Sequence, residues 1–260
     1  MRLQTRGPEV GVCNICGKTA RLTEDHIPPK GCPKVGQAYL MDIMGLIGTK
    51  AEKRSKRFFQ NGVKYKSICS NCNNVLLGSE YDPELIDFSH LLKEKIESRL
   101  FLPIQITTKL NRVVRSVLGH LMAHGIDLHR KGPDFELLTD YFLNSSAPWP
   151  TKLKLYCWPY PSNDQVVIRI AGYVSVRTGI PNSIFTLIKF FPIAFLITPD
   201  NPPESSFSYS RIDPLLTADI DDEILLTLPI SNIPRIRWPE APDKFGMIMH
   251  TPYSFGASRN

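Results

Sequence analysis

Four of the six cysteines form two CxxC pairs, Cys13 with Cys16 and Cys69 with Cys72. Each pair makes a tight knuckle that offers two thiolates to one ion, so two knuckles can close a tetrahedral zinc site. The alternatives are four incidental buried thiols, or disulfides. We favour zinc, because the other two cysteines are isolated and the paired spacing is typical of metal sites in reduced, cytoplasmic proteins.

An acid and a histidine, Asp25 and His26, lie between the two knuckles and are followed by Pro28 and Pro29. Residues 20–23 can form a strand that delivers both side chains at its end, because the prolines exclude a helix there. An isolated Asp-His pair is more often structural than catalytic. A segment fixed at both ends by zinc is nevertheless a rigid platform for a general base and a metal ligand.

The combination of CxxCG, DHIPPKG and CxxCN resembles the HNH nucleases of the ββα-metal class in their zinc-stapled form, over about residues 10 to 85. The resemblance implies an N-terminal ββα-metal domain with a structural zinc on the four paired cysteines. It implies that His26 activates water, and that Mg²⁺ or Mn²⁺ is bound by Asp25 and by Asn73, which follows the second knuckle. Family members also brace the histidine ring with an asparagine, for which Asn61 is the best candidate.

A cluster of basic residues lies between the DHIPPKG segment and the second knuckle. It sets seven cations against a single acid, Glu52. Most charge runs are solvated surfaces. We favour a nucleic-acid-binding surface, because the cluster adjoins the candidate active segment and carries Phe58 and Phe59 beside it. The expected phosphate contacts are Lys50, Lys53, Arg54, Lys56, Arg57, Lys64 and Lys66.

The overall prediction is an α+β chain in three parts: an HNH domain at residues 1–80, a helical connector at 81–146 and a β-rich regulatory or partner-binding domain at 147–260. A short helix is predicted at 39–47, a strand at 63–68, and helices that begin after Cys72, at Asp82 and at Thr108. His120 and His124 are interpreted as surface or packing residues. Strands are predicted at 152–158, 165–177, 183–198, 223–228 and 246–250.

These observations predict a metal-dependent HNH endonuclease that hydrolyses DNA. Its layout resembles the nuclease effectors of bacterial anti-phage and restriction systems. The alternatives are a non-catalytic zinc-stapled module that binds nucleic acid, or an RNA nuclease. The net charge of +6 fits a polyanionic partner. We expect a cytoplasmic protein with no signal or membrane segment, and control of the nuclease by a partner protein or by the C-terminal domain. The expected protein partners are a regulatory protein or a second copy of the chain.

Overall fold

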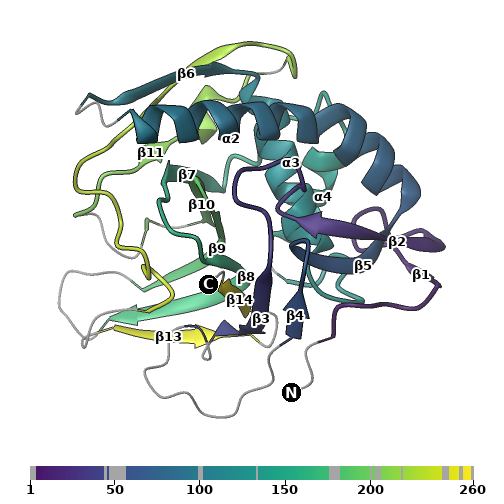
Figure 1. Cartoon of the computed structure of the whole chain (residues 1–260). Coiled ribbons are helices and arrows are strands. Elements are labelled where there is room, and N and C mark those ends of the chain that lie inside the picture. The colour runs from purple at the N-terminus through teal and green to yellow at the C-terminus, as the bar shows by residue number, and fades with distance from the viewer. Residues whose placement is uncertain are drawn as a thin grey trace.

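The computed structural model describes residues 4–43, 46, 57–98, 102–132, 134–175, 182–199, 201–202, 206–217, 219–241, 246–251 and 254–258. Within these ranges the architecture is mixed α+β, with three α-helices and antiparallel sheets, as the sequence predicts at this level (Figure 1). None of the described helices has both the length and the apolar character needed to cross a membrane.

The N-terminal sheet carries both the knuckles and His26. Its three strands are β1 (Val10–Val12), β2 (Thr19–Ile27) and β5 (Val63–Cys69), in the order β1-β2-β5. β2 and β5 pair antiparallel with His26 opposite Lys64, and the register shifts next to Thr23. The predicted strand at 63–68 is confirmed. The strand predicted at 20–23 is longer and continues through His26, because β5 supplies hydrogen-bonding partners from Leu22 to Ile27.

A wide helix, η1 (Asn71–Tyr81), begins inside the second knuckle and runs into α2 (Asp82–Glu97). This arrangement of two antiparallel strands followed by a helix agrees with the elements predicted for the first 80 residues. Asp82 begins α2, with Pro83 beside it in the first turn, as its sequence suggests.

The helix at the centre of the molecule is α3 (Leu110–Ala123), in which every residue except Arg112 is buried. It packs against η1, α2, α4 (Phe135–Leu143), β2, β5 and β8 (Figure 1). Because neighbours surround it, α3 is enclosed on its polar side too, and its polar side chains need buried partners.

The last turn of α3 receives hydrogen bonds from two distant parts of the chain. The amide of Asn14, in the first knuckle, donates to the carbonyls of Met122 and Gly125 at 3.3 and 3.0 Å. Buried Arg169, in the C-terminal half, donates to the carbonyls of Met122 and Leu128 at 3.4 and 3.1 Å. Carbonyls at the end of a helix have no partner within it, so both parts of the chain are anchored at this point.

A nine-stranded antiparallel sheet forms the other side of the molecule, with β13 paired to β8 beside the main path β11-β7-β10-β9-β8-β14-β3-β4. Two strands of this sheet come from the first sixty residues. The strands are β3 (Ala38–Asp42), β4 (Arg57–Phe59), β7 (Lys154–Pro159), β8 (Gln165–Ser175), β9 (Ser183–Phe190), β10 (Ile193–Thr198), β11 (Ser210–Arg211), β13 (Gly246–His250) and β14 (Ser254–Ser258).

Two sequence predictions change in this sheet. The helix predicted at 39–47 is wrong for residues 39–42, which belong to β3, because Ala38 and Leu40 are buried and β14 offers a pairing edge. The single strand predicted at 183–198 is two strands with a turn at Phe191 and Pro192. The other C-terminal strands are confirmed, with β12 (Ile224–Leu228) pairing outside this sheet with an unpredicted strand, β6 (Ile104–Thr108).

One core of buried apolar side chains contains residues from all three predicted segments, including Ile68, Leu118 and Phe195. A second core surrounds Trp158 and Trp238, which confirms that these tryptophans are core residues. The boundaries at residues 80 and 146 remain predictions, and both the main core and the large sheet extend across them.

Candidate functional site

The two knuckles bring their four sulfur atoms together, all within 4.8 Å of one another. The Sγ atoms of Cys16 and Cys69 are 3.7 Å apart. Zn–S bonds of 2.3 Å in a tetrahedron would place the sulfurs roughly 3.8 Å apart. The four thiols therefore fit a zinc ion, and all six cysteines of the chain are free of disulfides.

Hydrogen bonds within the cluster already stabilise one thiolate. The sulfur of Cys13 accepts a hydrogen bond from the backbone N–H of Cys69 at 3.3 Å. Together with a stronger bond from the Cys72 thiol, this lowers the pKa of Cys13 to about 4. Burial raises the pKa of Cys16 to about 11. A divalent cation would offset the cost of holding further thiolates here, and four sulfur ligands would leave it no open position for chemistry.

The strand β2 separates the side chains of the DHIPPKG segment between two faces. Glu24 and His26 lie on one face, where both are at least partly exposed, and Asp25 lies on the buried face. Burial, Lys64 and Lys30 lower the pKa of His26 below its ordinary value. The imidazole is therefore neutral at pH 7 and has a free lone pair with which to accept a proton.

Asp25 is occupied by a buried histidine from α3. Its Oδ2 lies 2.9 Å from Nδ1 of His120, and Nε2 of the same ring lies 2.9 Å from Oδ1 of Asp82. Asp82 also accepts a bond from the Ser116 hydroxyl at 2.7 Å. Burial disfavours the charged ring, but the two carboxylates outweigh it and raise the pKa of His120 to about 10. His120 is therefore a buried imidazolium that donates from both nitrogens.

Asn73 joins η1 to β2. Its side-chain amide donates to the hydroxyl of Thr23 at 2.9 Å and to the carbonyl of Glu24 at 3.0 Å. The structure thus places Asn73 at the contact between strand and helix, whereas Asp25 is enclosed against His120 and faces away from His26. The roles predicted for Asp25 and Asn73 as ligands of a catalytic divalent ion stay predictions.

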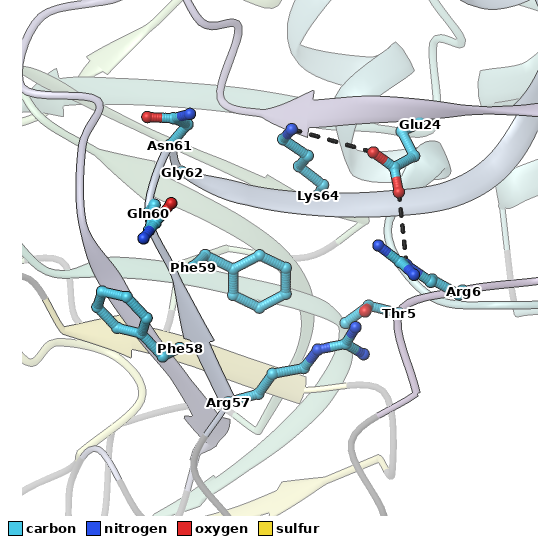
Figure 2. A pocket seen from close by; sticks show the side chains of 10 residues that line it. All are labelled: Thr5, Arg6, Glu24, Arg57, Phe58, Phe59, Gln60, Asn61, Gly62 and Lys64. Atoms are coloured by element: carbon cyan, nitrogen blue, oxygen red, sulfur yellow. Dashed lines mark ion pairs between the residues drawn. The ribbon is translucent and has the colours of Figure 1, made fainter.

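Beside His26 the surface is hollowed into a groove of about 370 Å³ (Figure 2). Lys64, which pairs with His26 across the two strands, forms part of its wall. Gly62 also lines it, and a Cβ added there would lie 3.9 Å from the Cδ2 atom of His26. Two lining residues, Gly62 and Lys64, are therefore neighbours of the candidate base. We call this cavity the basic groove. Its lining residues are Thr5, Arg6, Glu24, Arg57, Phe58, Phe59, Gln60, Asn61, Gly62 and Lys64.

The basic groove holds three cations against one acid. Glu24 forms ion pairs with Arg6 at 3.5 Å and with Lys64 at 3.9 Å, while the guanidinium of Arg57 lies 5.2 Å from the ring centre of Phe59. Figure 2 shows Arg57 and Phe59 turned toward Arg6 on the far wall. An excess of exposed positive charge in a concave surface favours a phosphate ligand.

The predicted site residues are only partly brought together. Arg57, Lys64 and Asn61 line the basic groove, and Lys66 pairs with Glu24 in the register of the two strands. The other four predicted cations, Lys50, Lys53, Arg54 and Lys56, lie outside the described residues.

Sequence reasoning missed two groove residues, Arg6 and Glu24. The period of two along β2 could have placed Glu24 on the same face as His26. No local signal marks Arg6, because its position depends on a bridge between the N-terminal arm and Lys66.

The histidines of α3 are buried, which confirms packing over a surface position. His120 bonds Asp25 and Asp82, and Nε2 of His124 lies 3.2 Å from the hydroxyl of Tyr65. Burial lowers the pKa of His124 to about 3, so this ring is neutral. The two rings on one helix therefore differ in charge, because only His120 faces carboxylates.

Comparison with protein-family models, with curated proteins and with solved structures finds no match to this chain.

Proposed function

We propose that this chain is an HNH-type endonuclease that hydrolyses phosphodiester bonds, with DNA as the expected substrate. The observation that carries the proposal is the position of His26. It is partly exposed on β2, and its cross-strand partner Lys64 lines the basic groove. The strand that pairs with β2, β5, runs into the second cysteine knuckle and then into η1. The geometry supports the same function as the resemblance of the motifs.

The proposed chemistry uses His26 as a general base. The low pKa that burial, Lys64 and Lys30 give His26 keeps its ring able to accept a proton from water at neutral pH. Lys64 and the two groove arginines would hold the negatively charged phosphate in front of that water. Positioning and electrostatic stabilisation together supply most of the catalysis in reactions of this class.

Zinc would hold this arrangement without taking part in the reaction, because its four thiolate ligands would fill its coordination sphere. A need for Mg²⁺ or Mn²⁺ stays a prediction from the resemblance. Of the acids near His26, Glu24 shares its face of β2, whereas Asp25 does not.

A second function is a non-catalytic, zinc-stapled module that binds nucleic acid. The burial of Asp25 against His120 favours it, because the carboxylate expected to take part in catalysis is already neutralised. This alternative predicts binding without cleavage and no effect of divalent metal. An RNA nuclease is a third candidate, since the basic groove would accept the phosphates of either nucleic acid.

The deciding experiment measures cleavage of supercoiled plasmid, single-stranded DNA and RNA in Mg²⁺, Mn²⁺ and EDTA. It compares the wild-type protein with His26→Ala, and with His90→Ala as a matched control, because His90 is an exposed histidine on α2. We expect cutting that is lost only in His26→Ala, while each variant keeps one zinc per chain. Equal binding by all three proteins, with no cutting of plasmid, single-stranded DNA or RNA in any metal, would favour the binding module.

The proposed nuclease activity would have to be controlled in the cell. A nuclease that cuts host DNA freely would be toxic, so we propose that a partner protein, a second copy of the chain or its own C-terminal strands restrain it, as in an anti-phage or restriction effector. Full activity of the isolated chain on bacterial genomic DNA would contradict this restraint.

A further inference from the structure

We propose that the substrate strand is single: its phosphates lie in the basic groove, and a neighbouring base stacks on an aromatic pair at the edge of the large sheet. This inference rests on the proposed function, because it names the strand form that would reach His26. It starts from the two aromatic residues of that edge, Tyr39 and Phe58.

Tyr39 and Phe58 are cross-strand neighbours on β3 and β4, and their ring centres lie 5.1 Å apart. Both are exposed for residues of their size, with 38% and 44% of their surface accessible. β4 ends the sheet, so beyond it the described residues add no further strand. The pair therefore presents a ring surface to solvent, which a flat, apolar ligand could cover.

The aromatic pair lies at the rim of the basic groove, because Phe58 is one of the groove's lining residues. Along β4 the side chains alternate, so that Arg57 and Phe59 turn toward Arg6 while the ring of Phe58 projects to the other side of the strand (Figure 2). A chain that leaves the groove across the edge of β4 would thus pass directly from cations to exposed rings.

A single strand of nucleic acid has the chemistry that the basic groove and the neighbouring aromatic pair would recognise. Its backbone carries one negative charge per nucleotide, which complements Arg6, Arg57 and Lys64, and its unpaired bases offer free faces for stacking on aromatic side chains. A duplex matches the groove equally well in charge, but its base faces are already stacked on one another. The exposed rings therefore favour a single strand over a duplex, without preference for a base sequence.

The experiment measures binding and cleavage of a single strand, of the same sequence as a duplex, and of the corresponding RNA strand. It compares the wild type with Phe58→Ala, Tyr39→Ala and Phe58→Trp. Leu225→Ala is the control, because Leu225 is a similarly exposed apolar residue on the two-stranded sheet. Each alanine variant should weaken single-strand binding by about 5- to 100-fold. Phe58→Trp and the control should bind as the wild type does, and duplex affinity should not change.

Cleavage and binding separate this inference from the proposed function. If the alanine variants bind the single strand as tightly as the wild type, the inference is overturned, even if plasmid cutting by His26 is established. If they lose single-strand affinity while no protein cuts any substrate, the stacking surface is supported and the nuclease is rejected. The DNA and RNA strands distinguish which sugar the site accepts.

Discussion

Replacing His120 by glutamine tests the buried charge triad that ties β2 to the helices. The substitution keeps a hydrogen-bonding side chain of similar size but removes the positive charge between Asp25 and Asp82. The His120 side chain has 1% of its surface exposed and that of Asp25 has 5%, so water cannot compensate for the loss. We expect the His120→Gln protein to fold less stably at pH 7.

The magnitude follows from the pKa of His120. A rise from the ordinary 6.5 to about 10 corresponds to about 5 kcal/mol of preference for the protonated ring, at 1.36 kcal/mol per pKa unit. Burial also raises the pKa of Asp25, so part of this energy offsets the cost of a buried carboxylate. Breaking a buried ion pair by removing one partner typically costs about 3 to 5 kcal/mol. We expect a loss in this range.

The pH dependence has a definite sign. Because the folded pKa of His120 is raised, its stabilisation is fully present below pH 6.5 and is lost as the pH rises toward 10. The wild type should therefore lose stability across this window relative to His120→Gln, whose own stability should improve on acidification as the unpaired Asp25 takes up a proton. Comparing the two proteins at each pH cancels the contribution of the zinc thiolates.

The assay is urea unfolding, followed by circular dichroism at pH 6, 7.5 and 9 with zinc present. His90→Gln is the control, because His90 is exposed and its Nε2–H donates to the Gly31 carbonyl, 2.9 Å away. Its free energy of unfolding should change by about 1 kcal/mol or less. A His120→Gln protein within about 1 kcal/mol of wild type at pH 7.5, with the same pH dependence, would refute the charged triad.

Three further predictions concern zinc, the candidate base and the groove. Cys72→Ser should lose its bound zinc and unfold at lower temperature, whereas Cys157→Ala should keep one zinc per chain, as measured by metal analysis. Lys64→Gln should raise the pKa of His26 and move the acid limb of the cleavage profile to higher pH, because Lys64 disfavours the protonated ring. Arg57→Gln should weaken binding uniformly across sequences and reduce the salt dependence of log Kd by about one phosphate contact.

Controls for these variants lie elsewhere on the surface. Lys93→Gln on α2 removes a half-buried cation that pairs with Glu97 at 3.5 Å, and should leave both the pH profile and the salt dependence unchanged. Zinc retained by Cys72→Ser would contradict a four-thiolate site. An acid limb that stays in place in Lys64→Gln would mean that a group other than His26 sets it.

Local patterns predicted the parts of the site that depend on neighbours in sequence. The CxxC spacing predicted the cysteine cluster, and the alternation at 63–68 predicted β5. The partner of Asp25 could not be predicted this way, because His120 is 95 residues distant and reaches β2 only through the packing of α3. The same holds for β3, whose strand conformation depends on β14 at the far end of the chain.

The position of Asp25 next to His26 in the sequence did not predict that the two side chains lie on opposite faces of β2. Asp25 and His26 are adjacent in the chain, which suggested a shared role, yet adjacent residues on a strand point to opposite faces. The prediction of a strand was correct, and its own geometry implies the separation. The extended length of β2 beyond residue 23 is what turned the pair into one buried and one accessible group.

The hydrogen bonds to the carbonyls at the end of α3 limit how this protein can evolve by exchanging segments. Asn14 of the first knuckle and Arg169 of the C-terminal sheet donate to the same carbonyl, that of Met122. A gene rearrangement that exchanged residues 1–80 for another zinc-stapled hairpin would remove one of these donors, Asn14, together with Asp25, one of the two carboxylates that bond His120. The N-terminal hairpin and α3 therefore have to be exchanged together, and a substitution at a contact in one of them requires a compensating substitution in the other.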